Sequence, residues 1–476
     1  MRLLLINPCN PLVNTGSKKN RWNKYRAWKP LGLLVLAGLT PAEWEITIVD
    51  ENTGVPDYKR MPRPDLMGVS AFTSQAPRAY ELAAEFRTRG VPVVMGGIHA
   101  TMRPAEASER VDAVVTGEAE SVWTQVLEDA RRGALKPLYE GSLEALEKTP
   151  FPRHDLLPTG YHFGSIQTTR GCPLNCSFCS VSAFNGREYR RRSIEDVVAE
   201  FKLIREKEVL IVDDNLIGTR GDHIARAKEL FLAMIEADLG KKWVAQATIN
   251  MADDEELLRL AERAGCTAVF IGFETTGDEG LIEVRKKYNI QKSRDFKASV
   301  RRIQRHHILV VGSFIIGLDV DRSGIGLDIA DTATRYGVDA INVMFLTPLP
   351  GTELWKKMEE EDRIAADSFP EDWKYYTLTL PVGRYRHLSR AEIIEEMHSC
   401  NRSFYSCARI LRRVGRNFWK RHKAFLSLVC NLSYRKNTHL GRKVHWEFKR
   451  SLDQFQLNRR LPTTGDNLHV GTPPSE

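Results

Sequence analysis

The chain has 476 residues, of which 42% are hydrophobic and 27% are charged, and these proportions are those of a soluble globular protein rather than a disordered or collagen-like one. At about 100–200 residues per domain, this length predicts two to four domains. No apolar stretch approaches the ~18 residues of a membrane span, and residues 1–8 are too short for a secretory signal, so we expect a cytosolic protein. The net charge of +8 arises between residues 401 and 450, where fourteen Lys and Arg accompany one acid.

The first 137 residues alternate between short β-branched runs and amphipathic helical patterns. We expect strands at residues 3–7, 45–50, 66–72, 91–96 and 113–116, and helices at 33–39, 79–89 and 120–132. Strands that alternate with helices at this spacing predict an α/β domain with a doubly wound, Rossmann-like parallel sheet. Ligands of such sheets bind outside the carboxyl ends of the strands, where this chain places small or polar residues. Taken singly, these residues are better explained as tight turns.

Residues 138–161 form a proline-containing connector, which we expect to be an ordered crossover between domains. The alternation resumes over residues 162–362 with helices such as 194–207, 224–237 and 255–264 and with six expected strands, at 164–169, 209–213, 243–249, 268–274, 310–317 and 341–347. Six such units predict a (β/α)6 partial TIM barrel with its chemistry at the C-terminal mouth. Residues 363–460 predict a basic, mostly helical extension, and residues 461–476 predict a disordered tail.

Three of the eight cysteines, Cys172, Cys176 and Cys179, lie directly after the first expected barrel strand. Thiolates are the usual ligands of [4Fe–4S] clusters, and three of them can hold three irons while the fourth iron stays open to an exogenous ligand. Zinc is the competing metal, but a structural zinc site takes four protein ligands, commonly from paired Cys-x2-Cys units, and the sequence has no second pair. Buried, unrelated thiols are the structural alternative, and this is how we interpret the five scattered cysteines.

The Cys-x3-Cys-x2-Cys segment, with an aromatic residue before its third cysteine, resembles the motif of the radical S-adenosylmethionine (SAM) superfamily. The resemblance implies that the open iron chelates the amino and carboxylate groups of SAM. One electron, from a reductant such as flavodoxin or ferredoxin, then cleaves SAM to a 5′-deoxyadenosyl radical that removes a hydrogen atom from a substrate. The resemblance also implies SAM contacts at Phe178, Asp214, Gln246, Glu274, Gly312 and Gly317, with Asn250 as a further candidate.

Each of these positions has a structural alternative. The strand-end residues could serve ordinary barrel packing, and Asp214 could cap a helix. The run Tyr189–Ser193, which follows the cysteine loop, carries three arginines that could neutralise an anionic cluster–SAM complex or an anionic group of the substrate. It could equally be a solvated segment before a helix that is capped by Ser193.

A doubly wound domain ahead of such a barrel resembles the cobalamin-binding class of the same superfamily. The likeness is carried by residues 49–52, 70–73, 96–101 with Pro104, and 115–120. It implies that a corrin approaches the strand ends closely, at Ser70, Thr73, Gly96, Gly97, His99, Gly117 and Glu118. The Asp-x-His-x-x-Gly motif that supplies a histidine to cobalt in many cobalamin proteins is absent after Asp50. His99 could therefore be a cobalt ligand or a turn residue, and an unligated lower face of cobalt is our hypothesis.

The basic region over residues 409–430 interleaves apolar and aromatic residues with cationic ones, at Arg409, Arg412, Arg413, Arg416, Lys420, Arg421 and Lys423. Such a region could lie peripherally on the inner face of an anionic membrane, bind nucleic acid, or close the barrel with a solvated outer face. Barrel closure is the interpretation that we favour, and nucleic acid is the least favoured partner.

These features predict a cobalamin-dependent radical SAM methyltransferase, with a [4Fe–4S] cluster, SAM and cobalamin as cofactors, that methylates an unactivated carbon of a small-molecule or lipid substrate. One SAM would yield the radical, and a second would remethylate cobalt. A rival with the same cofactors is cyclisation, ring contraction or oxidation without methyl transfer. Methylthio transfer to tRNA fits less well, because those enzymes carry further cysteines in an N-terminal domain where this chain has only Cys9. A non-enzymatic metal- or nucleic-acid-binding module is the alternative from another class.

Overall fold

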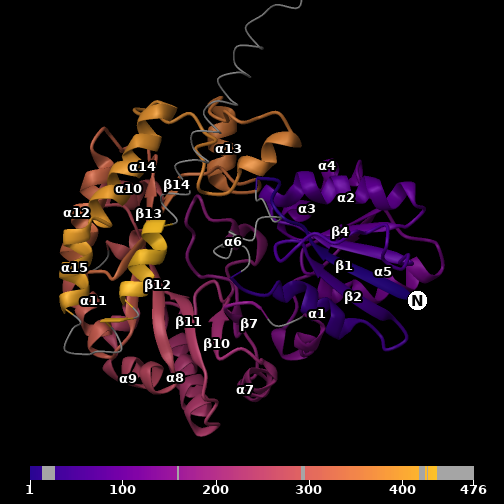
Figure 1. Cartoon of the computed structure of the whole chain (residues 1–476), viewed down its shortest axis with the longest axis horizontal. Helices are drawn as coiled ribbons and strands as arrows, with labels where there is room; N and C mark the ends of the chain where they lie inside the picture. Colours follow the sequence, from indigo (N-terminus) through magenta and orange to yellow (C-terminus); the bar gives the residue numbers. More distant parts are fainter. Residues whose placement is uncertain (13–26, 158–159, 291–294, 417–423, 426, 437–476) are drawn as a thin grey trace, which may run out of the picture.

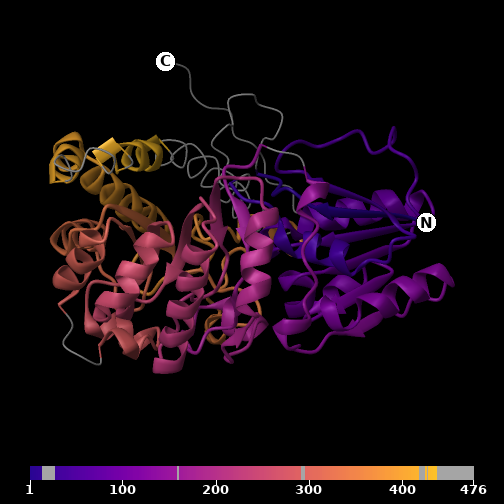
Figure 2. The same cartoon turned by 90° about the horizontal axis from the view of Figure 1, so that it is seen from below.

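The computed structural model describes residues 1–12, 27–157, 160–290, 295–416, 424–425 and 427–436. Two parallel six-stranded sheets lie side by side, with the N-terminal sheet at the right of Figure 1 and the barrel sheet at its centre and left. Seen from below in Figure 2, the same two halves are again adjacent, and the C-terminal helices lie on the side of the barrel. The expected α/β architecture of a doubly wound sheet, a partial barrel and a helical C-terminal region is confirmed.

The N-terminal sheet has the strand order β2-β1-β3-β4-β5-β6, and all its adjacent strands are parallel. Its elements are β1 (Arg2–Asn7), α1 (Leu31–Leu39), β2 (Glu45–Asp50), β3 (Leu66–Ser70), α2 (Ala76–Thr88), β4 (Val93–Gly96), α3 (Ile98–Met102), α4 (Pro104–Ser108), β5 (Ala113–Thr116), α5 (Trp123–Arg131) and β6 (Leu138–Glu140). Successive side chains of a strand face opposite sides, so Leu4 and Ile6 join one apolar cluster while Leu3 and Leu5 join another. Because β2 and β3 flank β1, the topological switch point lies between β1 and β3.

The N-terminal sheet extends beyond the end at residue 137 that the sequence predicts. β6 pairs with β5, with Leu138 opposite Val114 and Glu140 opposite Thr116. A strand of three residues directly after Pro137 carries too little periodicity to be separated from the proline-containing connector. The connector therefore begins after Glu140, and it contains two short 3-10 turns, at Leu146–Lys148 and His154–Leu156.

The barrel sheet has the strand order β7-β10-β11-β12-β13-β14, again with parallel pairs throughout. Its strands are β7 (Gly164–Ile166), β10 (Glu208–Ile211), β11 (Lys242–Ala247), β12 (Cys266–Glu274), β13 (Leu309–Ile316) and β14 (Ala340–Phe345), and its principal helices are α7 (Ile194–Leu203), α8 (Gly221–Glu236), α9 (Glu255–Arg263), α11 (Phe296–Arg305) and α12 (Ile325–Tyr336). Each of the six expected strands is confirmed, with ends displaced by a few residues. The expected cap of α7 is also confirmed, because Ser193 Oγ accepts a hydrogen bond from the Asp196 amide at 3.1 Å.

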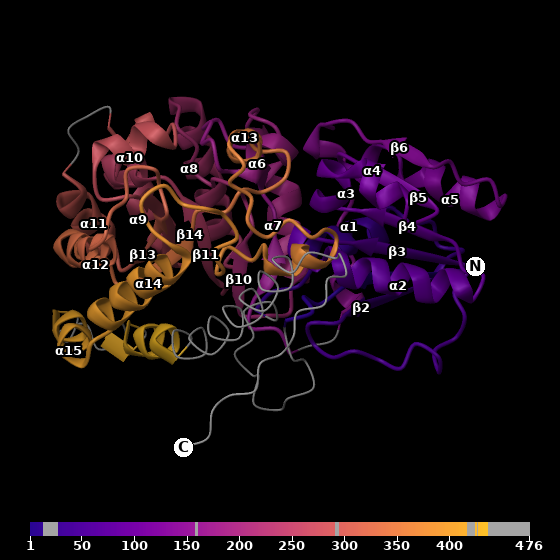
Figure 3. The same ribbon diagram turned by 90° about the horizontal axis from the view of Figure 1, so that it is seen from above.

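A short antiparallel hairpin, which the sequence did not predict, brackets the cysteine loop. β8 (Thr169–Arg170) pairs with β9 (Arg190–Arg191), and α6 (Ser180–Phe184) lies between them in the chain. In Figures 1 and 3, α6 lies between the barrel strands and the N-terminal sheet, and it contacts α3. The cysteine loop runs directly into α6, so it lies at the boundary between the two halves of the molecule.

The C-terminal extension covers the edge of the barrel at β14. It contains α14 (Arg390–Phe404) and α15 (Cys407–Arg416), and α14 packs on α12; α13 (Glu353–Glu360) precedes the extension at the end of the barrel segment. Tyr405 Oη accepts a hydrogen bond from the Ile341 amide at 2.9 Å and donates one to the Ile341 carbonyl at 2.8 Å, which satisfies both backbone groups of this residue on the edge strand. Arg413 is buried against the Phe404 ring and donates to Asn431 Oδ1 at 2.7 Å. Arg409 pairs with Asp331 of α12 at 2.7 Å, and Asn431 Nδ2 donates to the Asp339 carbonyl at 3.0 Å, so the described part of this region packs on the barrel. Residues 417–423 and the expected tail at 461–476 lie outside the described residues.

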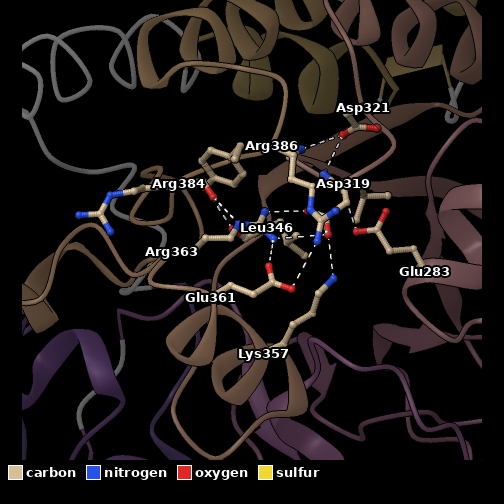
Figure 4. Close-up of polar contacts among 12 residues, drawn as sticks. Glu283, Asp319, Asp321, Leu346, Lys357, Glu361, Arg363, Arg384 and Arg386 are labelled. Atoms are coloured by element: carbon tan, nitrogen blue, oxygen red, sulfur yellow. Dashed lines mark hydrogen bonds and ion pairs between the residues drawn. The ribbon is translucent and has the colours of Figure 1, made fainter.

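A network of charged side chains attaches the extension to the barrel mouth (Figure 4). Asp319, just after the carboxyl end of β13, accepts from Arg363 Nη2 at 2.7 Å and from Lys357 Nζ at 2.7 Å. Arg386 Nε lies 3.2 Å from the same carboxylate. Glu283, at the end of α10 (Asp278–Glu283), accepts from the Asp319 amide at 2.8 Å. These contacts hold residues from 357 to 386 at the rim of the barrel.

Candidate active site

Backbone hydrogen bonds anchor the cysteine loop at its start and near its middle, and another closes a turn within it. The Cys172 amide donates to the Gly186 carbonyl at 3.4 Å, and the Cys179 amide donates to the Cys176 carbonyl at 3.2 Å. Ser177 N donates to the Val284 carbonyl at 3.2 Å, which ties the loop to the segment after α10. All three cysteines are free thiols of intermediate exposure. The loop therefore presents three thiols from one short, fixed segment.

Burial keeps these thiols protonated in the absence of a metal. It raises the pKa of Cys176 to about 12 and that of Cys179 to about 11, and it also raises the pKa of Cys172. The negative charge of one thiolate raises the pKa of the next, so three thiolates in this loop would repel one another. Iron held by Cys172, Cys176 and Cys179 would take the place of their protons and offset this repulsion.

The donor set fits an iron–sulfur cluster. Within the residues that the structure describes, no group of three or more His, Cys, Asp and Glu side chains is arranged to hold a metal ion. A cluster differs from a single ion because each of its irons takes its own thiolate, and three cysteines supply three such positions.

Asp213 and Asp214 shape the entry to this loop. Asp214 Oδ2 accepts from the Gly171 amide at 3.0 Å and from Asn185 Nδ2 at 2.9 Å, and these two residues flank the cysteine loop. Asp213 is fully buried and accepts from the amide of Thr168 at 2.6 Å and from the hydroxyl of Thr169 at 2.9 Å. The carboxylates at the end of β10 thus fix the strand-to-loop transition, which gives Asp214 a structural role beside its expected contact with SAM.

Glu274 and Lys286 form a buried ion pair beside the cysteines. Glu274 has a φ of +67°, a left-handed conformation that is uncommon for a residue other than glycine, and the pairing of β12 with β13 shifts register at this point. Lys286 Nζ also donates to the Gly272 carbonyl at 3.0 Å, and its positive charge lowers the pKa of Cys172 and of Cys176 against the raising effect of burial. The sequence predicted Glu274 but missed Lys286, because a lysine twelve residues downstream carries no local signal of burial.

The other expected SAM contacts are spread over the barrel. Gln246 is exposed on β11, and Phe178 packs against the core. Asn250 is buried; its Nδ2 donates to the Gly218 carbonyl at 3.1 Å, while its Oδ1 has no hydrogen-bond partner within the described residues. A Cβ on Gly312 would lie 3.2 Å from the Phe273 ring, and one on Gly317 would lie 2.5 Å from Tyr385. Close packing against neighbouring side chains therefore explains why both positions are glycine.

Ion pairs join the cysteine loop to the N-terminal domain. Glu118, at the carboxyl end of β5, accepts from Arg190 Nη1 at 2.8 Å and from Arg170 Nη1 at 3.0 Å. Arg170 Nη2 donates to Glu120 Oε1 at 2.8 Å. Arg170 is two residues before Cys172, so the carboxyl edge of one sheet is held against the loop at the mouth of the other. We call these four side chains, Glu118, Glu120, Arg170 and Arg190, the interdomain clamp.

Two arginines of the run are neither solvated nor free to meet an exogenous anion, whereas the expected cap by Ser193 is confirmed. Arg190 is buried against Glu118, and Arg192 is buried against Glu200, so neither is solvated and both already have anionic partners within the protein. Only Arg191 is exposed. Sequence patterns cannot show that Arg190 meets a glutamate 72 positions away.

The expected corrin contacts all lie at the carboxyl edge of the N-terminal sheet. Two of the glycines there are required by close packing of the turns themselves. A Cβ on Gly97, which has a φ of +90°, would lie 2.8 Å from Ser70 Oγ. A Cβ on Gly117, with a φ of +66°, would lie 2.2 Å from the Gly141 carbonyl oxygen. The small residues therefore bring neighbouring turns together, whether or not they also face a ligand.

His99 is fully buried between the N-terminal domain and the C-terminal extension. Its Nε2 lies 2.9 Å from Tyr80 Oη and 3.3 Å from Glu106 Oε1, and its ring contacts the Trp373 ring edge-on at 5.4 Å. Its Nδ1 has no hydrogen-bond partner within the described residues. These contacts favour the turn-residue alternative over a cobalt ligand.

The sequence matches the radical SAM superfamily over residues 166–322 and the B12 binding domain over residues 25–127. It is 31% identical to an uncharacterized methyltransferase of Synechocystis sp., in an alignment that covers 77% of this chain and 70% of that protein. The chain is a radical SAM enzyme with a B12-binding domain. Membership of this family implies a [4Fe–4S] cluster, SAM and cobalamin as its cofactors.

Other relatives of this radical SAM enzyme span most of its length. Bacteriochlorophyllide d C-12(1)-methyltransferase of Chlorobaculum tepidum is 28% identical, over 81% of this chain and 84% of its own. An anaerobic magnesium-protoporphyrin IX monomethyl ester cyclase of Rubrivivax gelatinosus is 25% identical, over 98% and 90%. The solved structure of TsrM from Kitasatospora setae, a radical SAM methyltransferase with cobalamin and a [4Fe–4S] cluster bound, matches with a TM-score of 0.59 at 18% identity, over 77% and 78% of the two chains, and shares the fold. No helix among the described residues is long and apolar enough to span a membrane.

Proposed function

We propose that this enzyme transfers a methyl group from SAM to an unactivated carbon of a small-molecule or lipid substrate, with Cys172, Cys176 and Cys179 holding the cluster. Of the expected SAM contacts, Glu274 is best supported, because its strained backbone and buried partner Lys286 lie beside the thiols. Gln246 and Asn250 offer an exposed amide and an unpaired carbonyl oxygen for further contacts. When bound, the cluster and SAM supply a hydrogen-abstracting radical, and the corrinoid supplies a transferable methyl group.

The interdomain clamp is the observation that carries this proposal. A corrinoid on the carboxyl edge of the N-terminal sheet and a cluster on the cysteine loop would face each other, because Glu118 and Glu120 hold Arg170 against that edge. Methyl transfer to a substrate radical requires both cofactors within reach of one substrate. The clamp supports the proposal because it holds the two proposed binding loops together.

Two relatives support methyl transfer by their names, the Synechocystis methyltransferase and the bacteriochlorophyllide methyltransferase. The test is anaerobic incubation of the reconstituted enzyme with methyl-labelled SAM, an electron donor and fractionated lipid and pigment extracts. We expect 5′-deoxyadenosine to form and the label to enter one extract component. Formation of 5′-deoxyadenosine with an altered but unlabelled component would contradict methyl transfer.

That contrary result would favour the second candidate, a cyclase or oxidoreductase that uses the same cofactors. The relative that covers nearly the whole chain, including the C-terminal extension, is named as a cyclase. Its similarity extends over the residues that hold the rim of the barrel, where a substrate would enter.

We further propose that the C-terminal region contacts an anionic membrane surface. Leu411 is 69% exposed and Phe425 is 67% exposed, and Arg412 is exposed beside Leu411. Apolar side chains beside cations suit the boundary between lipid headgroups and acyl chains. Co-sedimentation with phosphatidylglycerol vesicles, but not with phosphatidylcholine vesicles, is the expected result, and equal recovery in both supernatants would contradict it.

A further inference from the structure

Phe72 is a large apolar side chain in an exposed position at the switch point of the N-terminal sheet. It follows β3 by two residues, and 63% of its surface is exposed, more than for any other large hydrophobic residue in the described part of residues 1–140. The B12 binding domain match, residues 25–127, includes this position. Ser70 and Thr73 are among the corrin contacts that the sequence predicts, whereas Phe72 is not.

The backbone around Phe72 is fixed. The Phe72 amide donates to Gln75 Oε1 at 2.9 Å, and Gln75 Nε2 donates to the Pro8 carbonyl at 2.6 Å, just after β1. Asn10 Nδ2 donates to the Ser74 carbonyl at 2.8 Å. The neighbours of Phe72 in sequence, from Ala71 to Gln75, are otherwise buried. The exposed ring thus stands on a rigid turn that is bonded to the residues after β1, and it is not the tip of a loose loop.

Open α/β sheets bind ligands outside the carboxyl ends of their strands at the switch point, which lies here between β1 and β3. A flat conjugated macrocycle is a natural partner for an aromatic ring, because stacked or edge-on ring contacts add to the burial of apolar area. We infer that Phe72 is a corrin-contact residue, whose ring packs against the flat face of the bound corrinoid. This inference rests on the proposed use of cobalamin.

The test compares corrinoid affinity among full-length variants that are purified and reconstituted anaerobically. Phe72→Ala should weaken hydroxocobalamin binding roughly tenfold or more in an absorbance titration, because it removes the apolar contact of one ring. Phe72→Tyr should bind within about threefold of the parent, because the ring remains. Phe151→Ala, which alters another exposed phenylalanine, should bind like the parent.

Iron content and the melting temperature report folding, and since Phe72 is exposed, neither should change in Phe72→Ala. Equal affinity of Phe72→Ala and the parent would overturn the inference while leaving the proposed cofactor intact. Loss of affinity in Phe72→Tyr equal to that in Phe72→Ala would also overturn it, because a retained ring would then not suffice. A parent protein that binds no corrinoid would instead refute the proposed function, and the inference with it.

Discussion

The interdomain clamp makes a quantitative prediction for Glu118→Gln. The Glu118 side chain is 3% exposed, and its carboxylate meets Arg190 at 2.5 and 2.8 Å, Arg170 at 3.0 Å and the Glu144 amide at 3.1 Å. These partners hold the pKa of Glu118 below its usual range despite its burial. The neutral amide keeps the size of the side chain but leaves the guanidinium of Arg190 buried without its anion.

Breaking a buried ion pair from one side costs about 3–5 kcal/mol of stability. Arg190 keeps the carbonyl of Glu144 at 2.8 Å and that of Asn185 at 3.1 Å, and Arg170 keeps Glu120. We therefore expect the lower end of the range, about 3 kcal/mol, for Glu118→Gln. The exposed pair of Arg153 and Asp155, with side chains 46% and 52% exposed, is the matched control, and Arg153→Gln should cost less than about 1 kcal/mol.

The assay is urea denaturation of Glu118→Gln, Arg190→Met and the double variant, followed by circular dichroism. Because the two side chains form one buried unit, the double variant should lose about 2 kcal/mol less than the sum of the single losses. Additive losses, or a loss for Glu118→Gln as small as that of the control, would refute the clamp. Weaker corrinoid binding in Glu118→Gln without any loss of stability would instead assign Glu118 to the cofactor.

Three further outcomes follow from the same structure. Asp214→Ala should lower the iron content after reconstitution severalfold, since the cysteine loop loses its anchor at Gly171. The control Asp222→Ala, at an exposed position, should leave the iron content unchanged. Equal iron contents in the two variants would contradict the anchoring role of Asp214. Burial raises the pKa of Asp213 to about 6, so the folded state favours the protonated carboxyl. The stability that this protonated form contributes is fully present below the ordinary pKa near 3.8 and is lost as pH rises through about 6. Between pH 4 and 7 the melting temperature of the parent should fall relative to that of Asp213→Asn, by the equivalent of at most about 3 kcal/mol, and parallel pH profiles would contradict this. His99→Ala should destabilise the protein by about 2–3 kcal/mol yet keep its corrinoid affinity, and the opposite pattern would make His99 a cobalt ligand.

The fold could be predicted because its signals are local. The buried strands of both sheets are short β-branched runs between amphipathic helices, and their order in the chain restricts the topology to parallel sheets. β6 was missed because a three-residue edge strand beside a proline has no periodicity of its own. The β8–β9 hairpin was missed for the same reason, since each of its strands has two residues.

The site was predictable only where its chemistry is concentrated in one segment. Three cysteines within eight residues predict a cluster loop from the sequence alone. Lys286 and the partners of Arg190 could not be found in this way, because their significance depends on which distant side chain the fold brings beside them. Phe72 was not selected because the sequence alone does not distinguish an exposed aromatic residue at the end of an expected strand from a core residue.

The most direct test of the central assignment is the cluster content of the protein with Cys172, Cys176 and Cys179 all replaced by alanine. Parent and variant would be purified without oxygen and reconstituted with iron and sulfide, and the variant with Cys9, Cys266 and Cys400 replaced would serve as the control. We predict that the parent and the control show the electron paramagnetic resonance signal of a reduced [4Fe–4S] cluster and that the triple variant of the loop loses both its bound iron and this signal. A full cluster signal in that variant would contradict the assignment of the loop as the cluster site.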